Sequence, residues 1–196
     1  MTHATRFVAV VAVLTALVLC VPVQAQTPLI DELRVRADQG NATAQYDLGV
    51  MYANGLGVPE DDAKAVRWLR LAAGQGYGAA QFTLGLWYDH GLGVPQDDIE
   101  AVRWYRLAAD QGDAGAQSNL AIMYENGKGV PQDYVQAHIW YNLAASRMAG
   151  GHRQHAVDGR DRAAGQMNPI QIAEAERLAR EWDAAHPHHQ ITASIH

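Results

Sequence analysis

The chain has 196 residues, of which 48% are hydrophobic and 18% charged, and its formal net charge is −6. This composition is typical of a globular protein with room for one domain and a substantial core. It disfavours nucleic-acid binding, because neutralising phosphates requires a stripe of Lys and Arg that no stretch of this chain supplies.

Residues 1–25 have the pattern of a cleavable export signal. Arg6 gives a positive start, residues 7–21 are an uncharged apolar run, and Val23-Gln24-Ala25 is a small-residue exit. The run is shorter than the roughly 20 residues of a membrane span, so we expect cleavage rather than an uncleaved anchor helix. A lipid anchor at Cys20 is disfavoured by the leucine before it. Cleavage leaves a thiol-free protein, periplasmic or secreted, without membrane insertion.

Residues 26–37 are predicted to form an N-terminal capping helix. Three of its apolar residues have counterparts 36 positions later in the chain: Leu33 with Leu69, Val35 with Leu71, and Ala37 with Ala73. The segment therefore corresponds to the second half of a repeat that continues downstream.

Residues 38–73, 74–109 and 110–145 are three copies of one sequence. They align without a gap, and 16 of the 36 columns are identical in all three. A fixed period of this length is typical of a solenoid, in which each copy buries its apolar face against its neighbours.

Each copy is predicted to be a helix–turn–helix. The first helix of the first copy runs from about Ala42 to Asn54 and ends at a Gly-rich loop that contains a proline. Aspartates at 61, 97 and 133 are placed as N-caps of the second helices, with capping boxes in the later two copies. The predicted buried stripes are Ala44, Leu48, Met51 and Tyr52 on the first helix, and Ala65, Trp68, Leu71 and Ala72 on the second.

The motif A-Q-x-x-L-G-x-x-Y-x-x-G-x-G-V-P-x-D, followed by A-x-x-W and A-A-x-x-G, resembles the Sel1-like repeat. That family is related to the tetratricopeptide repeats, so the resemblance implies an all-α solenoid that binds proteins with its concave face. One departure is Ala121, where the other copies have Gly49 and Gly85.

Residues 146–185 are predicted to contain a degenerate repeat and a C-terminal capping helix. Residues 152–165 resemble a first helix, and Asn168-Pro169-Ile170-Gln171 starts the last helix with a capping box and Pro at its first position. Residues 186–196 are predicted to be a disordered tail.

The candidate chemical groups have structural explanations. The Gly-rich loops recur in register and follow helices, so they are not phosphate loops. Tryptophans 68, 104 and 140 share one column, which favours a core role over a ligand platform. The Asp61-Asp62 and Asp97-Asp98 pairs are explained by capping. Histidines 186, 188 and 189 match no closed metal site. We therefore predict a monomer that is not an enzyme and has no catalytic residue, cofactor or metal.

The predicted binding surface lies on the concave edge of the first helices. Three columns there differ between copies while the core columns do not, as expected for a groove whose lining sets specificity. They contain Asp47, Thr83 and Asn119; Met51, Trp87 and Met123; and Asn54, His90 and Asn126.

These residues predict an exported protein–protein interaction module, an adaptor, scaffold or regulator of an envelope partner. The alternative is an envelope hydrolase acting on cell-wall material. It requires a pocket with a carboxylate of shifted pKa or a metal.

Overall fold

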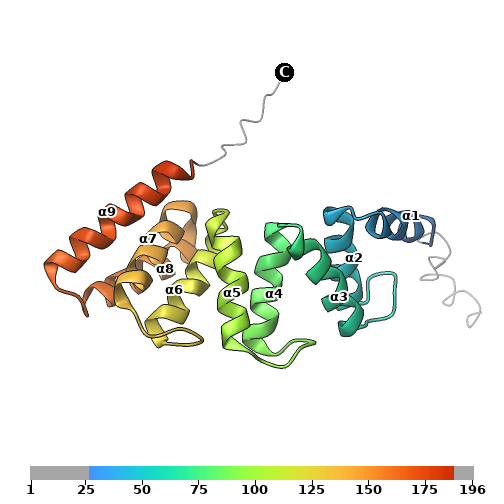
Figure 1. Cartoon of the computed structure of the whole chain (residues 1–196), viewed down its shortest axis with the longest axis horizontal. Helices are drawn as coiled ribbons and strands as arrows, with labels where there is room; N and C mark the ends of the chain where they lie inside the picture. The colour runs from blue at the N-terminus through green and yellow to red at the C-terminus, as the bar shows by residue number, and fades with distance from the viewer. Residues whose placement is uncertain (1–26, 188–196) are drawn as a thin grey trace, which may run out of the picture.

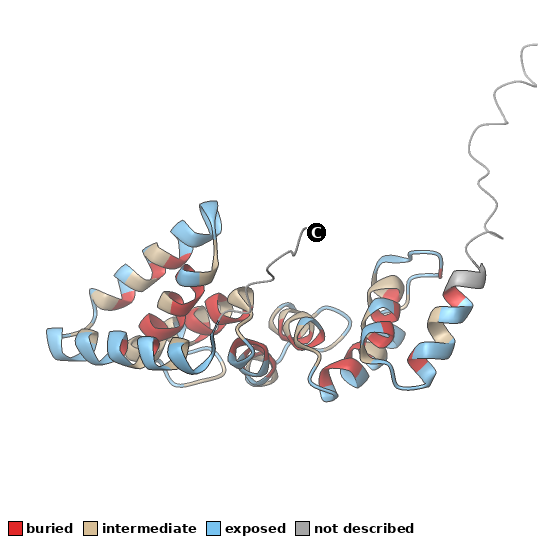
Figure 2. Ribbon diagram, turned by 90° about the horizontal axis from the view of Figure 1, so that it is seen from above, coloured by how far each residue is buried: buried red, intermediate tan, exposed pale blue. Residues whose placement is uncertain are grey.

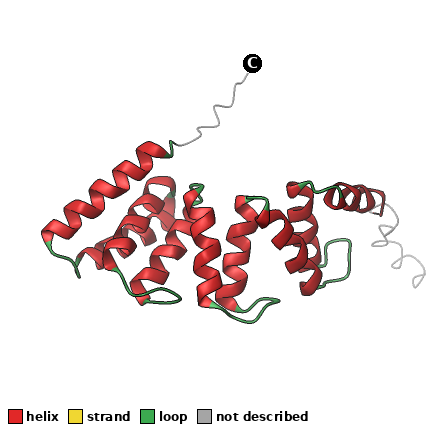
Figure 3. Ribbon diagram, in the orientation of Figure 1, coloured by secondary structure: helices red, strands yellow, loops and turns green. Residues whose placement is uncertain are grey.

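The computed structural model describes residues 27–187; the predicted export signal and the histidines at 188 and 189 lie outside this range. The described residues form nine helices and no strand (Figure 3). Their bounds are α1 Thr27–Asp38, α2 Ala42–Asn54, α3 Asp62–Gly74, α4 Gly78–His90, α5 Asp98–Asp110, α6 Ala114–Asn126, α7 Tyr134–Arg147, α8 Gly150–Ala164 and α9 Pro169–Ala185.

The helices follow one another along the long axis of the molecule, from α1 at one end to α8 and α9 at the other (Figure 1). Seen from above, the row bends into a shallow arc, with the first helices of the repeats toward its hollow side (Figure 2). We call the surface of α2, α4 and α6 the inner face and that of α3, α5 and α7 the outer face. The predicted all-α solenoid is confirmed.

Local sequence sets the helix ends. Gly55 ends α2 in the left-handed conformation (φ 64°) and its N–H bonds to the Met51 carbonyl, a backbone geometry that glycine adopts without strain. Asp61 then caps α3 by accepting a hydrogen bond from the Lys64 N–H at 2.9 Å. Asp97 and Asp133 cap α5 and α7 as predicted. The complete capping boxes predicted for α5 and α7 are wrong, because among the described helices the reciprocal bond is present only at Asn168 of α9.

Within a copy, the two helices touch through a small residue on the first and a large one on the second. A methyl group on Gly85 would lie 2.4 Å from the Tyr105 ring, so the close approach requires glycine there. The Tyr105 hydroxyl donates to Asp89 at 3.2 Å, and the equivalent Tyr141 donates to Glu125 at 2.5 Å. The first copy has leucine and alanine at these two positions, Leu69 and Ala53, so the pair changes together.

Between copies, two polar contacts repeat with the 36-residue period. Arg34, Arg70 and Arg106 each donate to the tyrosine hydroxyl 18 residues later, on the next first helix. The amides of Gln45, Gln81 and Gln117 bond to backbone carbonyls of the preceding second helix. The contact from Arg34 shows that α1 occupies the place of a second helix.

Several predicted core residues are placed differently by the structure. On the second helices Leu69 and Tyr105 are fully buried, whereas Leu71 is 43% exposed. Trp104 and Trp140 are buried but Trp68 is only half-buried. The prediction was wrong for Leu71. The apolar stripe of the second helix is wide, and in the first two copies no neighbouring helix covers the side of the stripe on which Leu71 lies.

The C-terminal helices depart from the repeat. Helix α8 packs on α7, and Gly159 lies so close to Tyr141 that a methyl group would meet its ring at 2.5 Å. Helix α9 packs mainly on α7, not on α8 as the second helix of a fourth repeat would. It is held there by an Arg147–Asp183 ion pair at 2.5 Å and by the Trp182 ring, 6.0 Å from Trp140.

Candidate protein-binding face

Eight of the nine predicted surface residues lie in separate places along α2, α4 and α6. Asn54, Thr83 and Trp87 come together around one cavity between the first two copies. Asp47 and Met51 line another hollow of about 360 Å³ against α1. His90, Asn119 and Asn126 lie outside both cavities.

Met123 requires a correction, because it is 1% exposed and part of the core. Its counterparts Met51 and Trp87 are only half-buried. The third copy is followed by α8, which packs more extensively on α7 than α4 does on α3 or α6 does on α5. Met123 therefore cannot line a surface groove.

The cavity between the first two copies, the inner cavity, has a volume of about 500 Å³. Its walls come from α2, α3, α4 and the two Gly-rich loops: Val50, Ala53, Asn54, Glu60, Asp62, Leu69, Thr83, Trp87, Gly91, Leu92 and Gly93. The Gly93 backbone approaches both neighbours closely, since a methyl group there would lie 2.9 Å from the Trp87 ring and 2.8 Å from Asp62 Cβ. The loops thus fix the shape of the opening.

Trp87 joins the two halves of the hydrophobic core. It packs against the cluster around α2 and against the cluster that runs from α3 to α9. The Trp87 indole therefore packs in the core on one side and lines the cavity on the other. This double role agrees with its being half-buried.

The charged side chains that line the inner cavity are all acidic. Glu60 and Asp62 are exposed carboxylates on its rim, and no Lys, Arg or His lies among its lining residues. Asn54 uses its amide to bond the Val50 carbonyl at 2.8 Å, and Thr83 bonds the Ala79 carbonyl at 2.8 Å. The cavity therefore presents an apolar wall beside an acidic rim.

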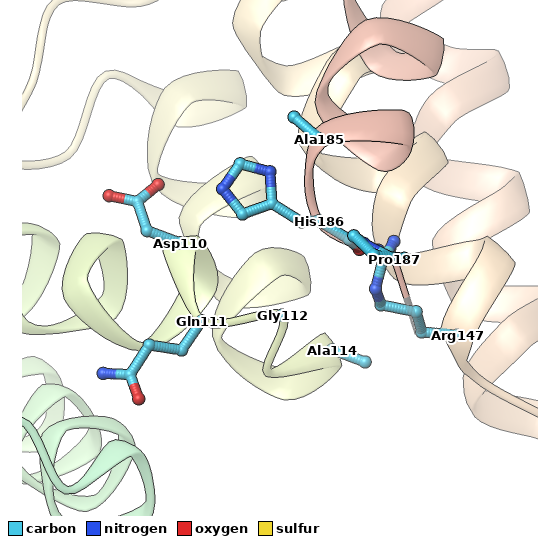
Figure 4. A pocket seen from close by; sticks show the side chains of 8 residues that line it. All are labelled: Asp110, Gln111, Gly112, Ala114, Arg147, Ala185, His186 and Pro187. Atoms are coloured by element: carbon cyan, nitrogen blue, oxygen red, sulfur yellow. The ribbon is translucent and has the colours of Figure 1, made fainter. Parts of the chain in front are cut away.

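A third hollow, of about 580 Å³, lies where the end of α9 meets the turn between α5 and α6 (Figure 4). In this view His186 lies between Asp110 and Arg147. Burial raises the pKa of Asp110, although Arg106 and His186 oppose the shift. The Arg147 side chain is only 7% exposed and is already paired with Asp183.

The hollow at the end of α9 was not predicted from the sequence. Its signal is at residue 147, where Arg replaces the glutamines found at 75 and 111. The side chains of those glutamines donate to the side-chain oxygens of Gln45 and Gln81. Arg147 instead pairs with Asp183 of α9, and the side-chain oxygen of Gln117 has no partner among the described residues.

Tyr105, Tyr141 and Glu125 have pKa values that are perturbed by contacts between packed helices. Burial raises the pKa of the Tyr105 and Tyr141 hydroxyls well above the ordinary value, and the neighbouring carboxylates add to the shift. Burial alone would raise the pKa of Glu125, but hydrogen bonds from Arg162 and Tyr141 bring it below its usual value. Among the described residues, no group of three His, Cys, Asp or Glu side chains could hold a metal ion. Nor does any described helix meet the length and apolarity required to cross a membrane.

The geometry defines an α-solenoid of stacked helix–turn–helix repeats. The Sel1 repeat model matches residues 42–77, 78–113 and 114–147, more than half of the chain. The chain belongs to the Sel1 repeat family, whose members are generally non-catalytic protein-interaction modules.

Two solved structures support this assignment. A Sel1 repeat protein from Oxalobacter formigenes is 39% identical, with a TM-score of 0.61, over 66% of this chain and 97% of that one. The c5321 protein, a protective antigen of uropathogenic Escherichia coli with an SLR fold, is 30% identical, with a TM-score of 0.57. That match covers 79% of this chain but 40% of the antigen. No curated protein matches the chain.

Proposed function

We propose that this protein is an exported adaptor or regulator that holds an envelope protein on its inner face, with binding centred on the inner cavity. The observation that carries the proposal is the cavity itself, because Trp87 walls it and two acidic residues rim it. Buried aromatics at the centre of a contact surface supply a large share of interface energy.

The inner cavity also favours one kind of partner segment. An apolar side chain would enter against Trp87 and Leu69, and a neighbouring Lys or Arg would face Glu60 and Asp62. Such pairing removes apolar surface from water and sets the orientation through charge.

Capture of the partner by the purified protein tests this proposal. Trp87→Met keeps an apolar side chain but removes the flat indole wall, so we expect capture from native envelope extract to fall about tenfold or more. Glu60→Gln, at an exposed rim position, should weaken capture less and reduce its dependence on salt. Leu56→Ala is the matched control, because Leu56 is exposed on the first loop and outside the cavity. Equal capture by all four proteins contradicts the proposal.

Trp87→Met is interpretable only if the repeats stay folded. Since Trp87 contacts both core clusters, we expect the variant to lose about 1–2 kcal/mol of stability, within the range for apolar exchanges in a partly buried site. A loss of several kcal/mol without a change in capture would assign the indole to packing alone.

Export is the second part of the proposal, and the pattern of residues 1–25 supports it. Intact-mass spectrometry of the protein from its native host should show a chain that begins at Gln26, or at the pyroglutamate formed from it. A species that retains Met1, or carries lipid on Cys20, contradicts this part.

A further inference from the structure

The outer face carries an apolar column that is exposed in some copies and buried in another. Val35, Leu71 and Leu107 are 54%, 43% and 40% exposed, whereas Leu143 in the same column is 2% exposed. The four positions are one period apart, so the helices that carry them are equivalent and their surroundings differ.

Helix α9 packs on α7 and covers the side of α7 that carries Leu143. Its Trp182 ring meets Trp140, and its Asp183 pairs with Arg147. Leu143 lies three residues after Trp140 and four before Arg147, which places all three on one side of the helix. The outer flank of a second helix is therefore a surface on which another helix packs.

The residues around the column change where α9 covers it. Arg67 and Arg103 are replaced by Ile139, and Arg70 and Arg106 by Asn142. Burying an unpaired guanidinium under a helix is costly, so the covered copy has neutral residues where the uncovered copies are basic. An uncovered copy can accept a helix only if that helix brings carboxylates.

Within the part of the chain that the structure describes, no carboxylate forms an ion pair with Arg67, Arg70 or Arg106, although Arg106 interacts electrostatically with Asp110. Arg67 lies over the Trp68 ring, and Arg106 bonds the Tyr124 hydroxyl. Arg103 pairs with Glu100 at 3.2 Å in an exposed contact that contributes little. On the outer face of α5, Arg103 and Arg106 thus lie beside one lining carboxylate, Asp110, in a chain of net charge −6.

Helix α5 also has the shape for a helical partner. A hollow of about 500 Å³ runs along it and under the third Gly-rich loop. Ile99, which is 69% exposed, and Leu107 lie along it, with Arg103 and Arg106 between them. Spacings of three, four and eight residues keep these side chains on one helix flank.

We propose that the outer face of α5 binds an acidic amphipathic helix of a partner protein, in the way that α9 packs on α7. Apolar residues of that helix cover Ile99 and Leu107, and its carboxylates pair with Arg103 and Arg106. This surface is separate from the inner cavity, so a solenoid holding one protein on its inner face can carry a second on its outer face.

A labelled peptide of residues 168–187 with Arg177→Glu and Arg180→Glu is the probe, because it keeps the apolar stripe and cap of α9 while becoming strongly acidic. Fluorescence anisotropy with the purified protein should show saturable binding that weakens as salt rises. Leu107→Asp should reduce affinity about tenfold or more, and Arg103→Glu should reduce both the affinity and its salt dependence. Leu56→Asp, an exposed leucine of the first loop, is the matched control and should bind normally.

Three results overturn the proposal. One is no saturable binding up to about 1 mM peptide, a concentration that corresponds to negligible affinity. Another is peptide binding that Leu107→Asp leaves unchanged but Trp140→Ala abolishes, because the peptide has then displaced α9 from α7. The third is a dimer in sedimentation analysis that Leu107→Asp dissociates, because the occupant is then a second copy of this chain.

Discussion

Replacing Trp104 by alanine is the most informative change to the core, because Trp104 lies in the central copy and is 8% exposed. Truncating a buried tryptophan costs about 3–5 kcal/mol. Here the indole N–H is buried without a hydrogen-bond partner among the described residues, and removing an unpaired donor returns part of the loss. The contact of Arg103 with the ring, 5.0 Å from its centroid, is exposed and adds little.

These opposing effects place the expected loss at the lower end of the range, about 3 kcal/mol. For a chain of this size that corresponds to a fall of about 6–12 °C in melting temperature. Urea titration followed by circular dichroism measures the loss directly. Trp104→Phe keeps a ring and removes the unpaired donor, so its cost should be nearer 1 kcal/mol.

Trp68→Ala is the internal control, because Trp68 occupies the same column in the first copy but is only half-buried. It should cost clearly less than Trp104→Ala. A loss below about 1 kcal/mol for Trp104→Ala, outside the range for buried aromatics, refutes the reasoning. So does a larger effect at Trp68.

Three further substitutions test other contacts. Gly85→Ala forces a methyl group against the Tyr105 ring, so the free energy of unfolding measured in urea should fall by about 1–3 kcal/mol. Gly74→Ala, with nothing within 4 Å of the added carbon, should leave it unchanged. Equal effects of the two substitutions contradict the packing of Gly85 on Tyr105. The pKa of Glu125 is lower when folded than when unfolded, so its contribution is present above its ordinary pKa of 4.5 and is lost as pH falls through the folded value. The stability difference between the wild type and Glu125→Gln should therefore be larger at pH 7 than at pH 3, and a difference that does not change with pH contradicts it. Arg147→Ala removes the ion pair to Asp183 and should speed amide hydrogen exchange in α9 but not in α4. An equal change of exchange rate in both helices contradicts the role of this ion pair in holding α9 on α7.

The helices themselves were largely predictable from the sequence, because local residues determine where they begin and end. Gly55 ends α2 through its backbone conformation, and Asp61 and Asn168 start helices through side-chain bonds to nearby N–H groups. These contacts span at most four residues, so the sequence contains them directly.

Exposure was less predictable, because it depends on helices distant in the sequence. Leu71 and Leu143 occupy the same column, yet only Leu143 is buried. Met51 and Met123 likewise share a column, and only Met123 belongs to the core. Periodicity assigns a residue to a side of its helix, but whether α8 or α9 lies over that side follows from tertiary packing.

The candidate site was predictable only in part for the same reason. Asn54, Thr83 and Trp87 were predicted as one surface and do line one cavity. Its acidic rim and the approach of Gly93 to Trp87 depend on how one copy stacks on the next, which no single repeat encodes. Whether these residues bind a partner stays a prediction.

Site-specific photo-crosslinking in the native host tests the central claim most directly. Asn54 and Asn126 occupy the same repeat column, and each bonds the carbonyl four residues earlier, but only Asn54 lines the inner cavity. A photoreactive side chain at position 54 should crosslink an envelope protein, and Trp87→Met should abolish that product, while position 126 should give little. Equal products from both positions, or a product at position 54 that survives Trp87→Met, would contradict the claim that the inner cavity is where this protein holds its partner.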